Sequence, residues 1–581
     1  MIKEFIVKTK SHRLTIILAL FVGIISIAPH LFFAFSVPDY SGIQISGIDA
    51  ESHYLARINE IYDGHFSLSN VFLPYKNQSY LIPPLGEIIV AFLGNIFFLD
   101  AIEINTLSKL IFPFFLFLLI YFFVYKIFLS KSIAILSSVL MFLGYNLISN
   151  PSSIINLFHL SSEVNSFLMY TRPINPQISS LFLFGSLLLL LKLLYHNKKN
   201  NFWILIVLGI LSGLSIYVSI YVWSFLLTFL SIYFIYYFCL KDWIKLKNIS
   251  IVIFINIVST IFFWINLLKI RIQPEYLDLS MRQGLIFNHE FIFSLWLLVS
   301  LLLILFFWPK EHQKIKKFFL FAIISLWIVS NQQIITGNVL QVGHYHWYIT
   351  KPIVSIILSF LFIYLLKKII NNKIIKNGII ILIIFILFYN GILIQTRAYQ
   401  YYYQEYLENQ RYSEVFSYLK NNYTSSQNIL SNIYLSEWLP VYTQHDALNN
   451  DYVGLYLNSK DYLIKRLFLN YKLRDINPQD IGELLEKEKS IISNRIFGIY
   501  FKEKYGSYDY ISEKIILSLE LMYNNFYNIE YKEIFKYFDI DLVVWDKHKY
   551  NDLLYKNISE LEEIKVVNND FIIYEVNYDK N

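Results

Sequence analysis

The sequence predicts an α-helical polytopic membrane bundle followed by a C-terminal extracytoplasmic α/β domain. Hydrophobic residues make up 56% of the 581 residues and charged residues only 16%, a balance typical of chains that cross a bilayer many times. Apolar runs long enough to cross the hydrocarbon layer, which takes about 20 residues, recur up to about residue 396. Beyond that point charges become frequent and the apolar runs shorten, as in a water-exposed domain.

The apolar runs predict about eleven spans. They cover residues 14–36, 108–127, 132–149, 178–195, 202–220, 221–240, 248–268, 291–308, 317–335, 352–366 and 377–396. A further run, 84–98, is short and follows two prolines, so we expect an interfacial or re-entrant helix there. The single cysteine, Cys239, excludes a disulfide within the chain and a cysteine-based metal site. No small-residue cleavage motif follows the first run, which we therefore expect to be a span rather than a cleaved signal.

The distribution of charge predicts the orientation of the bundle. Every second loop is rich in Lys and Arg, a pattern that marks cytoplasmic loops; the basic residues are Lys3, Lys8, Lys10, Arg13, Lys126, Lys131, Lys192, Lys198, Lys199, Lys241, Lys245, Lys247, Lys310, Lys314, Lys316, Lys317, Lys367, Lys368, Lys373 and Lys376. The alternation holds if 84–98 does not cross. We therefore expect a cytoplasmic N-terminus, with the long loops and the C-terminal domain outside. The net charge of +6 forms no basic patch with interleaved aromatics, so nucleic-acid binding is not expected.

The predicted organisation is a transmembrane module, residues 1–396, whose first outer loop is 37–107, and an extracytoplasmic domain, residues 397–581. In that domain, helical periodicity covers 412–419 and 513–526. Residues 541–545 read as a buried strand, and 564–576 as a β-hairpin. The domain contains no Gly-rich phosphate loop, zinc-ligand spacing or Gly-x-Ser-x-Gly motif.

Two carboxylates in the first outer loop are candidates for catalysis. Asp49 and Glu51 stand at the start of a helical stripe over 50–62, and Gly64 is placed to end that helix. One interpretation is structural: Asp49 caps the helix and Glu51 complements its dipole. Positions two apart on a helix diverge by about 200°, so the pair converges only if Asp49 precedes the helix. Asp49 would then be a base, and Glu51 a second carboxylate or, with Asp49, a ligand for a divalent cation such as Mg²⁺ or Mn²⁺.

Arg172 is almost the only basic residue in its outer loop, just before the span at 178–195. Its guanidinium could bind a phosphate with two hydrogen bonds. Extension toward lipid headgroups is an equally good interpretation.

The loop 331–348 is dense in amides and imidazoles, including His344 and His346. Such side chains beside a span usually line a cavity, and here they suit a sugar hydroxyl or a phosphate better than zinc, because no third type of ligand is nearby. An interfacial belt of aromatic residues and histidines is the alternative. The loop from Lys269 to Arg282 could meet anionic headgroups or a lipid phosphate, but a solvated loop is the more economical interpretation.

These motifs resemble those of the GT-C glycosyltransferases. The resemblance rests on the acidic run 49–57, on Asp63-Gly64, on 83–87, 172–176 and 331–346, and on 436–443 and 541–545 of the C-terminal domain. It implies a base at Asp49, a second acid at Glu51, and a phosphate ligand at Arg172 or Lys351, with Arg57 third. Ala50 separates two acids that are adjacent in the aminoarabinose and protein mannosyl transferases of this family. The Trp-Trp-Asp signature of oligosaccharyltransferases is missing from the C-terminal domain, which argues against a peptide-sequon acceptor.

The resemblance implies a hexosyltransferase-like, inverting membrane enzyme. It would move a sugar from a polyprenyl-phosphate-linked donor to an extracytoplasmic glycan, lipid or protein, with Arg57, Arg172, His344, His346 and Lys351 as candidate substrate-binding residues. Two alternatives are a transporter or flippase of lipid-linked glycans, which the scarcity of charges within the spans disfavours, and a non-catalytic envelope assembly factor. The enzymatic interpretation requires the acidic pair, Arg172 and the 331–348 loop to meet at one crevice.

Overall fold

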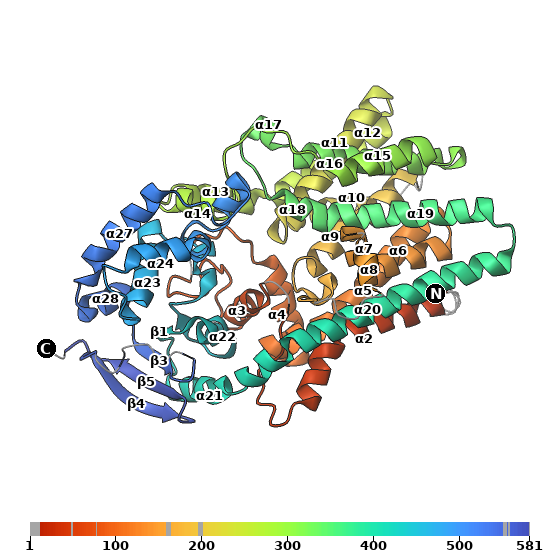
Figure 1. Ribbon diagram of the computed structural model, residues 1–581. Helices are drawn as coiled ribbons and strands as arrows, with labels where there is room; N and C mark the ends of the chain where they lie inside the picture. The colour runs from red at the N-terminus through yellow and green to blue at the C-terminus, as the bar shows by residue number, and fades with distance from the viewer. Residues whose placement is uncertain are drawn as a thin grey trace.

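The computed structural model describes residues 12–47, 50–76, 78–150, 152–157, 164–195, 202–549, 555 and 558–579. Long apolar helices form one end of the molecule, to the right in Figure 1, and the C-terminal domain with its small sheet forms the other. This arrangement confirms the predicted fold class, a polytopic helical bundle with a C-terminal α/β domain.

A helix occupies each predicted span. These helices are α2 (Arg13–Ser36), α5 (Ala101–Phe128), α6 (Lys131–Leu143), α9 (Gln177–Tyr195), α10 (Phe202–Leu214), α11 (Ile220–Cys239), α12 (Trp243–Ser259) with α13 (Ile261–Arg271), α15 (Leu295–Phe307), α16 (Gln313–Ser330), α19 (Lys351–Ile369) and α20 (Lys373–Asn409). Among the described residues, seven helices are long and apolar enough to cross a membrane, and α12 with α13, bent by 41°, would make an eighth. Helices α6, α10 and α15 have 13 residues each, about 20 Å, which is shorter than the hydrocarbon layer of about 30 Å.

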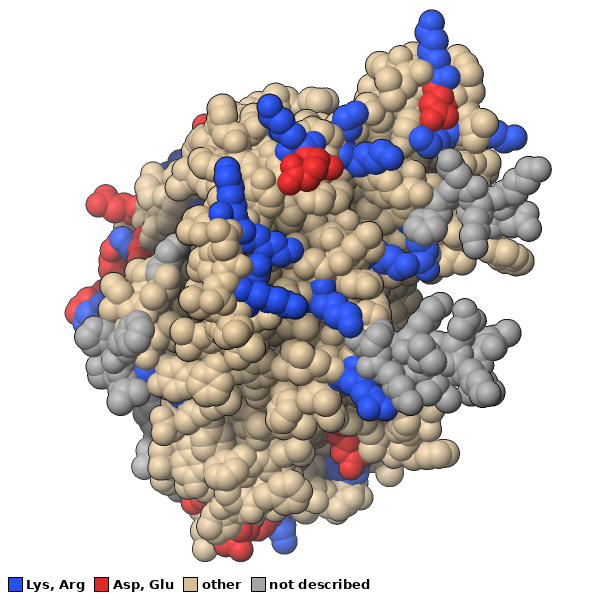
Figure 2. All heavy atoms as spheres, turned by 90° about the vertical axis from the view of Figure 1, so that its right-hand side faces the viewer, with Lys and Arg blue, Asp and Glu red and all other residues tan. Residues whose placement is uncertain are grey.

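Basic side chains gather on the face of the bundle that lies farthest from the C-terminal domain, and few acidic side chains accompany them (Figure 2). The helices that end on this side carry lysines in their last or first turns, namely Lys126, Lys131, Lys192, Lys245, Lys314, Lys316, Lys317, Lys367, Lys368, Lys373 and Lys376. The polar loop 331–348, which contains α17 (Gln333–Thr336) and α18 (Val342–Tyr345), lies at the opposite end, toward the C-terminal domain (Figure 1). The basic and the polar loops of the sequence are thus separated in space.

The first outer loop contains two helices, α3 (Glu51–Tyr62) and α4 (Leu85–Phe97). Helix α4 coincides with the short run predicted at 84–98 and packs against α3 and α5. The residue that caps α3 is Ala50, in a left-handed conformation with φ 59°. At the other end Gly64 follows the helix with φ 90°, a conformation that glycine adopts without steric strain.

The C-terminal domain holds a five-stranded sheet of order β2-β1-β3-β5-β4. Its strands are β1 (Asn428–Ser431), β2 (Asp446–Ala447), β3 (Leu542–Asp546), β4 (Leu561–Val567) and β5 (Phe571–Val576). Strand β1 runs parallel to β2 and β3, whereas β5 is antiparallel to β3 and β4. The predicted strand at 541–545 and the predicted hairpin at 564–576 are therefore confirmed.

The helices of the C-terminal domain lie mainly on one side of this sheet (Figure 1). They are α21 (Tyr412–Asn422), α22 (Ile433–Tyr442), α23 (Lys460–Leu473), α24 (Ile481–Lys487), α25 (Lys489–Ile492), α26 (Tyr500–Tyr505), α27 (Glu513–Tyr527) and α28 (Tyr531–Phe538). The predicted domain boundary at 396–397 falls inside α20, which continues without a break from the bundle to Asn409 (Figure 1).

One hydrophobic core joins the first outer loop to the C-terminal domain. Ile58 and Ile61 of α3 belong to the same buried cluster as Leu435 and Leu439 of α22, and the two helices pack against each other. The first outer loop is therefore part of the wall between the bundle and the C-terminal domain rather than a free loop.

Candidate functional site

A cavity of about 1880 Å³ lies where the bundle meets the C-terminal domain. Its walls come from five parts of the chain: the first outer loop, the segment around Arg172, residues 218–221 at the start of α11, the segments from α13 to residue 348, and residues 451–508 of the C-terminal domain. The apolar lining residues include Ile220 of α11 and Phe263, Trp264 and Leu267 of α13. The first outer loop, the Arg172 segment and the 331–348 loop all line this cavity. Of the acidic pair that the sequence required at the same crevice, Asp49 lies outside the described residues and Glu51 is not among the lining residues.

Asp49 lies outside the described residues. Its neighbour Ala50 lines the cavity, together with His53 and Tyr54 from the first turn of α3. His53 is buried, and its Nε2 forms a 2.7 Å hydrogen bond with the Tyr456 hydroxyl. Burial lowers the pKa of His53 well below its ordinary value, and the nearby Arg57 and Arg172 lower it further, so this ring is neutral at physiological pH.

Glu51 faces away from the cavity and is 2% exposed. Its Oε1 accepts hydrogen bonds from Lys109 Nζ and from Asn105 Nδ2 (3.0 Å), and its Oε2 accepts one from Ser46 Oγ (2.9 Å). Burial alone would raise the pKa of Glu51, but the Lys109 ammonium and the hydrogen bonds outweigh it and hold this pKa below its ordinary value. Glu51 is thus an ionised anchor between α3 and α5.

This arrangement does not suit the divalent cation that the sequence suggested at Asp49 and Glu51. Both oxygens of Glu51 already accept from donors, one of which is an ammonium group that would repel a cation. Within the described ranges, no group of three or more His, Cys, Asp or Glu side chains is placed to hold a metal ion.

Arg57, the third candidate for phosphate binding, is fully buried and already paired. Its Nε donates to Glu87 Oε1 at 2.5 Å, and its Nη2 donates to the carbonyls of Ile82 (3.2 Å) and Pro83 (3.1 Å). Burial lowers the pKa of Arg57, but the Glu87 carboxylate more than reverses this effect, so its pKa is raised. This ion pair fixes the start of α4 to α3.

Glu87 itself lines the cavity. Arg57 holds one of its oxygens, while Oε2 is buried and has no hydrogen-bond partner in the described part of the chain. A carboxylate in the first turn of an apolar helix, after two prolines, is a signal that could have identified Glu87 as a site residue. In the sequence, we interpreted Glu87 only as part of the motif at 83–87.

Arg172 lines the cavity in a fixed position. Its Nη1 donates to the Tyr348 hydroxyl at 2.6 Å, and its guanidinium lies 5.5 Å from the centre of the Tyr54 ring. Cation–π contact with one tyrosine and a hydrogen bond to another orient the group. Arg172 is therefore a cation held beside the first turn of α3.

His344 also lines the cavity, from α18 (Val342–Tyr345). Its ring lies 4.6 Å from that of Tyr221 and stacks on that of Tyr348 at 5.3 Å. Its Nδ1 is buried and has no hydrogen-bond partner among the described residues. The imidazole is thus held flat between tyrosines with one nitrogen available to a ligand.

His346 and Lys351 are not among the described residues that line the cavity. Lys351 donates to Ser149 Oγ at 2.9 Å and lies 5.3 Å from the centre of the Tyr145 ring. Of the predicted candidates for phosphate binding, only Arg172 is placed as a cation on the cavity wall.

Several amides of the 331–348 loop hold the wall together. Gln332 Nε2 donates to the Asn338 carbonyl at 2.5 Å, and Gln341 Nε2 donates to the Gln283 carbonyl at 2.9 Å. Gln332, Asn338 and Gln341 all line the cavity. The density of amides in this loop thus serves its backbone as well as the cavity surface.

Several cavity-lining residues have a buried polar atom without a hydrogen-bond partner among the described residues. These atoms include Glu87 Oε2, Asn175 Oδ1, Arg282 Nη1 and His344 Nδ1. Such groups are rare in folded proteins unless water or a ligand satisfies them. The cavity is therefore equipped to bind a polar molecule.

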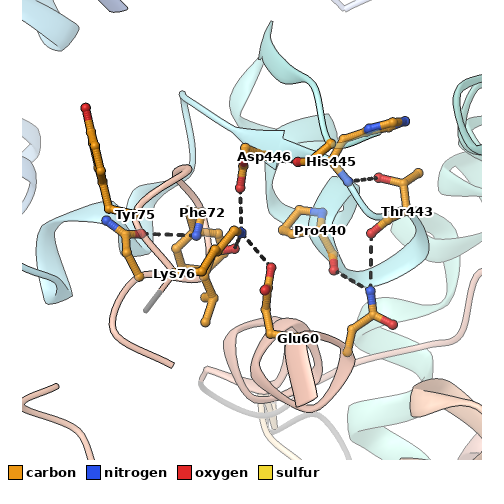
Figure 3. Close-up of polar contacts among 12 residues, drawn as sticks. Glu60, Phe72, Tyr75, Lys76, Pro440, Thr443, His445 and Asp446 are labelled. Atoms are coloured by element: carbon orange, nitrogen blue, oxygen red, sulfur yellow. Dashed lines mark hydrogen bonds and ion pairs between the residues drawn. The ribbon is translucent and has the colours of Figure 1, made fainter. Parts of the chain in front are cut away.

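A second polar cluster, remote from these atoms, joins the first outer loop to the sheet (Figure 3). Lys76 Nζ lies 2.6 Å from Glu60 Oε1 and 2.5 Å from Asp446 Oδ1, so it bridges α3 and β2. Burial raises the pKa of Glu60 to about 7, although Lys76 opposes this shift. Asn59 supports the contact by donating to the carbonyls of Pro440 and Thr443, both at 3.2 Å.

No protein-family model and no curated protein matches the sequence. Solved structures do match. ArnT from Cupriavidus metallidurans bound to undecaprenyl phosphate is 9% identical with a TM-score of 0.47, over 97% of this chain and 98% of that one. The same protein in the apo state is 9% identical with a TM-score of 0.46, over 98% of both chains. The apo oligosaccharyltransferase of Archaeoglobus fulgidus is 12% identical with a TM-score of 0.48, over 93% of this chain and 70% of that one.

Proposed function

We propose that this protein is a membrane glycosyltransferase that transfers a sugar from a polyprenyl-phosphate-linked donor to an extracytoplasmic acceptor. The observation that carries the proposal is the mixed lining of the cavity. Its apolar residues, such as Phe263, Trp264 and Leu267 of α13, suit an isoprenoid chain, and its polar residues include Arg172, His344, Asn175 and Glu87. A ligand that is a hydrocarbon at one end and a phosphosugar at the other fits both sets of residues.

Arg172 is the group that would bind the phosphate of the donor. Tyr54 and Tyr348 already fix its guanidinium, so little reorganisation is needed as negative charge develops on the leaving phosphate. His344 Nδ1, which lacks a partner in the described residues, is placed to contact the same phosphate or a sugar hydroxyl.

Asp49 would act as the base. It precedes Ala50, which lines the cavity, and a base must reach the acceptor hydroxyl there. The carboxylate takes the hydroxyl proton while the acceptor oxygen bonds to the anomeric carbon. The bond from that carbon to the phosphate oxygen breaks, and its electron pair leaves with the polyprenyl phosphate. This single displacement inverts the anomeric centre.

Glu87 replaces Glu51 as the second carboxylate in this proposal. Glu51 is enclosed by Lys109, Asn105 and Ser46, whereas Glu87 faces the cavity with one oxygen unpartnered within the described residues. That oxygen would accept a hydrogen bond from a hydroxyl of the sugar or of the acceptor.

The proposed orientation places the lysine-rich end of the bundle, with the N-terminus, in the cytoplasm. The lysines at the helix ends of Figure 2 support it, because basic loops are retained on that side. The cavity and the C-terminal domain, at the other end (Figure 1), would then be extracytoplasmic.

The test is transfer of radiolabel from a polyprenyl-phosphate-linked sugar into lipid, glycan or protein products in membranes that contain the full chain. Asp49→Asn should lower the rate by about 10²–10⁴-fold, the usual contribution of a general base. Asp63→Asn is the matched control, since Asp63 is an acid of the same loop that is not among the described cavity-lining residues. Full activity of Asp49→Asn would exclude Asp49 as the base, and movement of the labelled lipid across the bilayer without covalent change would favour a transporter.

A further inference from the structure

Arg282 connects the bundle side of the cavity to the C-terminal domain. It ends the short helix α14 (Tyr276–Arg282) and is 2% exposed. Its Nε donates to the Gly454 carbonyl at 2.7 Å, and its Nη2 donates to the carbonyls of Tyr456 (3.0 Å) and Asn458 (2.8 Å). The expectation of a solvated loop from Lys269 to Arg282 is therefore wrong at this residue, because the C-terminal domain covers it.

This buried charge has no carboxylate within ion-pair distance among the described residues. Asp278, one turn earlier, accepts a hydrogen bond from the Lys460 backbone amide at 3.2 Å. Asp451, on the neighbouring wall, pairs with Arg495 at 3.1 Å. Burial lowers the pKa of Arg282 to about 10; the Asp278 carboxylate opposes this shift and the Arg466 cation adds to it, so the cost of removing the cation from water is only partly offset.

Two of the three guanidinium nitrogens of Arg282 are hydrogen-bonded to the C-terminal domain. Arg282 lines the cavity, and its Nη1 is buried and without a hydrogen-bond partner in the described ranges. Because the other two nitrogens donate to backbone carbonyls of the C-terminal domain, the side chain cannot swing away. A guanidinium that is fixed in place, belongs to a cavity-lining residue and has one N–H without a partner among the described residues is complementary to an oxyanion.

We propose that Arg282 forms a second oxyanion subsite of the cavity, separate from Arg172, for a phosphate or carboxylate group of the substrate. Arg172 is held by Tyr54 and Tyr348, whereas Arg282 is held by the backbone of residues 454–458, so the two cations belong to different walls. Lys504 and Glu503 of α26 both line the cavity, so this helix adds no net charge to it. The inference deepens the proposed function: the acceptor is acidic, or the donor carries a second phosphate.

Binding to the full-length chain in lipid nanodiscs distinguishes these two sources. The lipid probes are undecaprenyl phosphate and undecaprenyl diphosphate, which differ by one phosphate. The soluble probes are trigalacturonate and its methyl ester, which differ only in charge. We expect Arg282→Gln to weaken binding of the probe that carries the second oxyanion by about tenfold or more, the effect of losing a charged hydrogen bond.

Arg466→Gln is the matched control. Arg466 is 3% exposed, its Nη1 donates to the carbonyls of Leu448 (3.1 Å) and Asn450 (2.6 Å), and burial lowers its pKa to about 10 as well. It is not among the described residues that line the cavity. Arg466→Gln should therefore reduce stability without changing the affinity for any probe.

If Arg282→Gln loses affinity only for undecaprenyl diphosphate, the subsite binds the donor. If it loses affinity only for trigalacturonate, and binds it no better than the methyl ester, the subsite binds the acceptor. Unchanged affinities in Arg282→Gln, or equal losses in Arg466→Gln, overturn the inference. Should Arg282→Gln fail to fold, the wild-type chain still decides, because equal affinities within both probe pairs exclude the subsite. Failure of the wild-type chain to bind undecaprenyl phosphate would instead contradict the proposed function.

Discussion

Arg57 and Arg282 are two buried arginines beside one cavity, and they differ in a single respect. Both donate to backbone carbonyls, and both join segments that are distant in sequence. Arg57 also has Glu87 at 2.5 Å, which raises its pKa against the effect of burial. Burial lowers the pKa of Arg282 to about 10. The difference between the two pKa shifts comes from the Glu87 carboxylate in contact with Arg57. Arg282, which also joins distant segments, is the arginine that we propose binds a ligand.

The largest effect on the free energy of unfolding is expected at the ion pair between Arg57 and Glu87. Arg57→Gln or Glu87→Gln alone leaves a buried charge without its partner and should destabilise the protein by about 3–5 kcal/mol. The double variant Arg57→Gln/Glu87→Gln removes both charges and should recover part of that loss. The measurement is a double-mutant cycle on denaturant unfolding of the detergent-solubilised chain. Strictly additive effects would show that the pair is not coupled, and the comparison with Arg282 would then lose its basis.

A smaller effect is expected for Arg172, the oriented cation of the cavity. Arg172→Gln should weaken binding of undecaprenyl phosphate about 10–100-fold, because one charged contact to the phosphate is lost. Its melting temperature should change little, since the side chain is only partly buried. Lys351→Gln is the control, as Lys351 contacts Ser149 rather than the cavity. An equal or larger loss of affinity in Lys351→Gln would move the phosphate site away from Arg172.

The smallest effect is a pH dependence at the cluster of Figure 3. Burial raises the pKa of Glu60 to about 7 in the folded chain from an unfolded value near 4.5. The folded state then binds the proton more tightly, so stability is highest below pH 4.5 and falls as pH rises to about 7. Glu60→Gln should flatten this dependence by removing the titrating group, while Lys76 keeps its contact with Asp446. The check is the apparent melting temperature between pH 5 and 8, where an unchanged slope would contradict the assignment to Glu60.

The sequence predicted the helices of the bundle well, because the length and polarity of a run decide whether it can cross a bilayer. It also predicted the hairpin of β4 and β5, whose strands are neighbours in the chain. It did not predict that α3 and α22 share one core. That contact joins residues almost four hundred positions apart, and no local pattern encodes it.

The roles of the charged residues were harder to infer. Glu51 was a candidate catalytic acid, and the structure encloses it with Lys109 and Asn105. Lys109 did carry a signal, since a lysine within an apolar span needs a partner. Glu87 and Arg282 were visible as charges at helix ends, but their positions in the cavity wall depend on Arg57 and on the carbonyls of residues 454–458.

By itself, the sequence determined which segments are apolar enough to enter a membrane, which end of the bundle is basic, and which loops hold the polar groups, because these are local properties of composition. Only the tertiary structure decided which cations are neutralised and which face the cavity. The state of a buried charge depends on the few ångströms around it, and the partners that occupy that space come from distant parts of the chain.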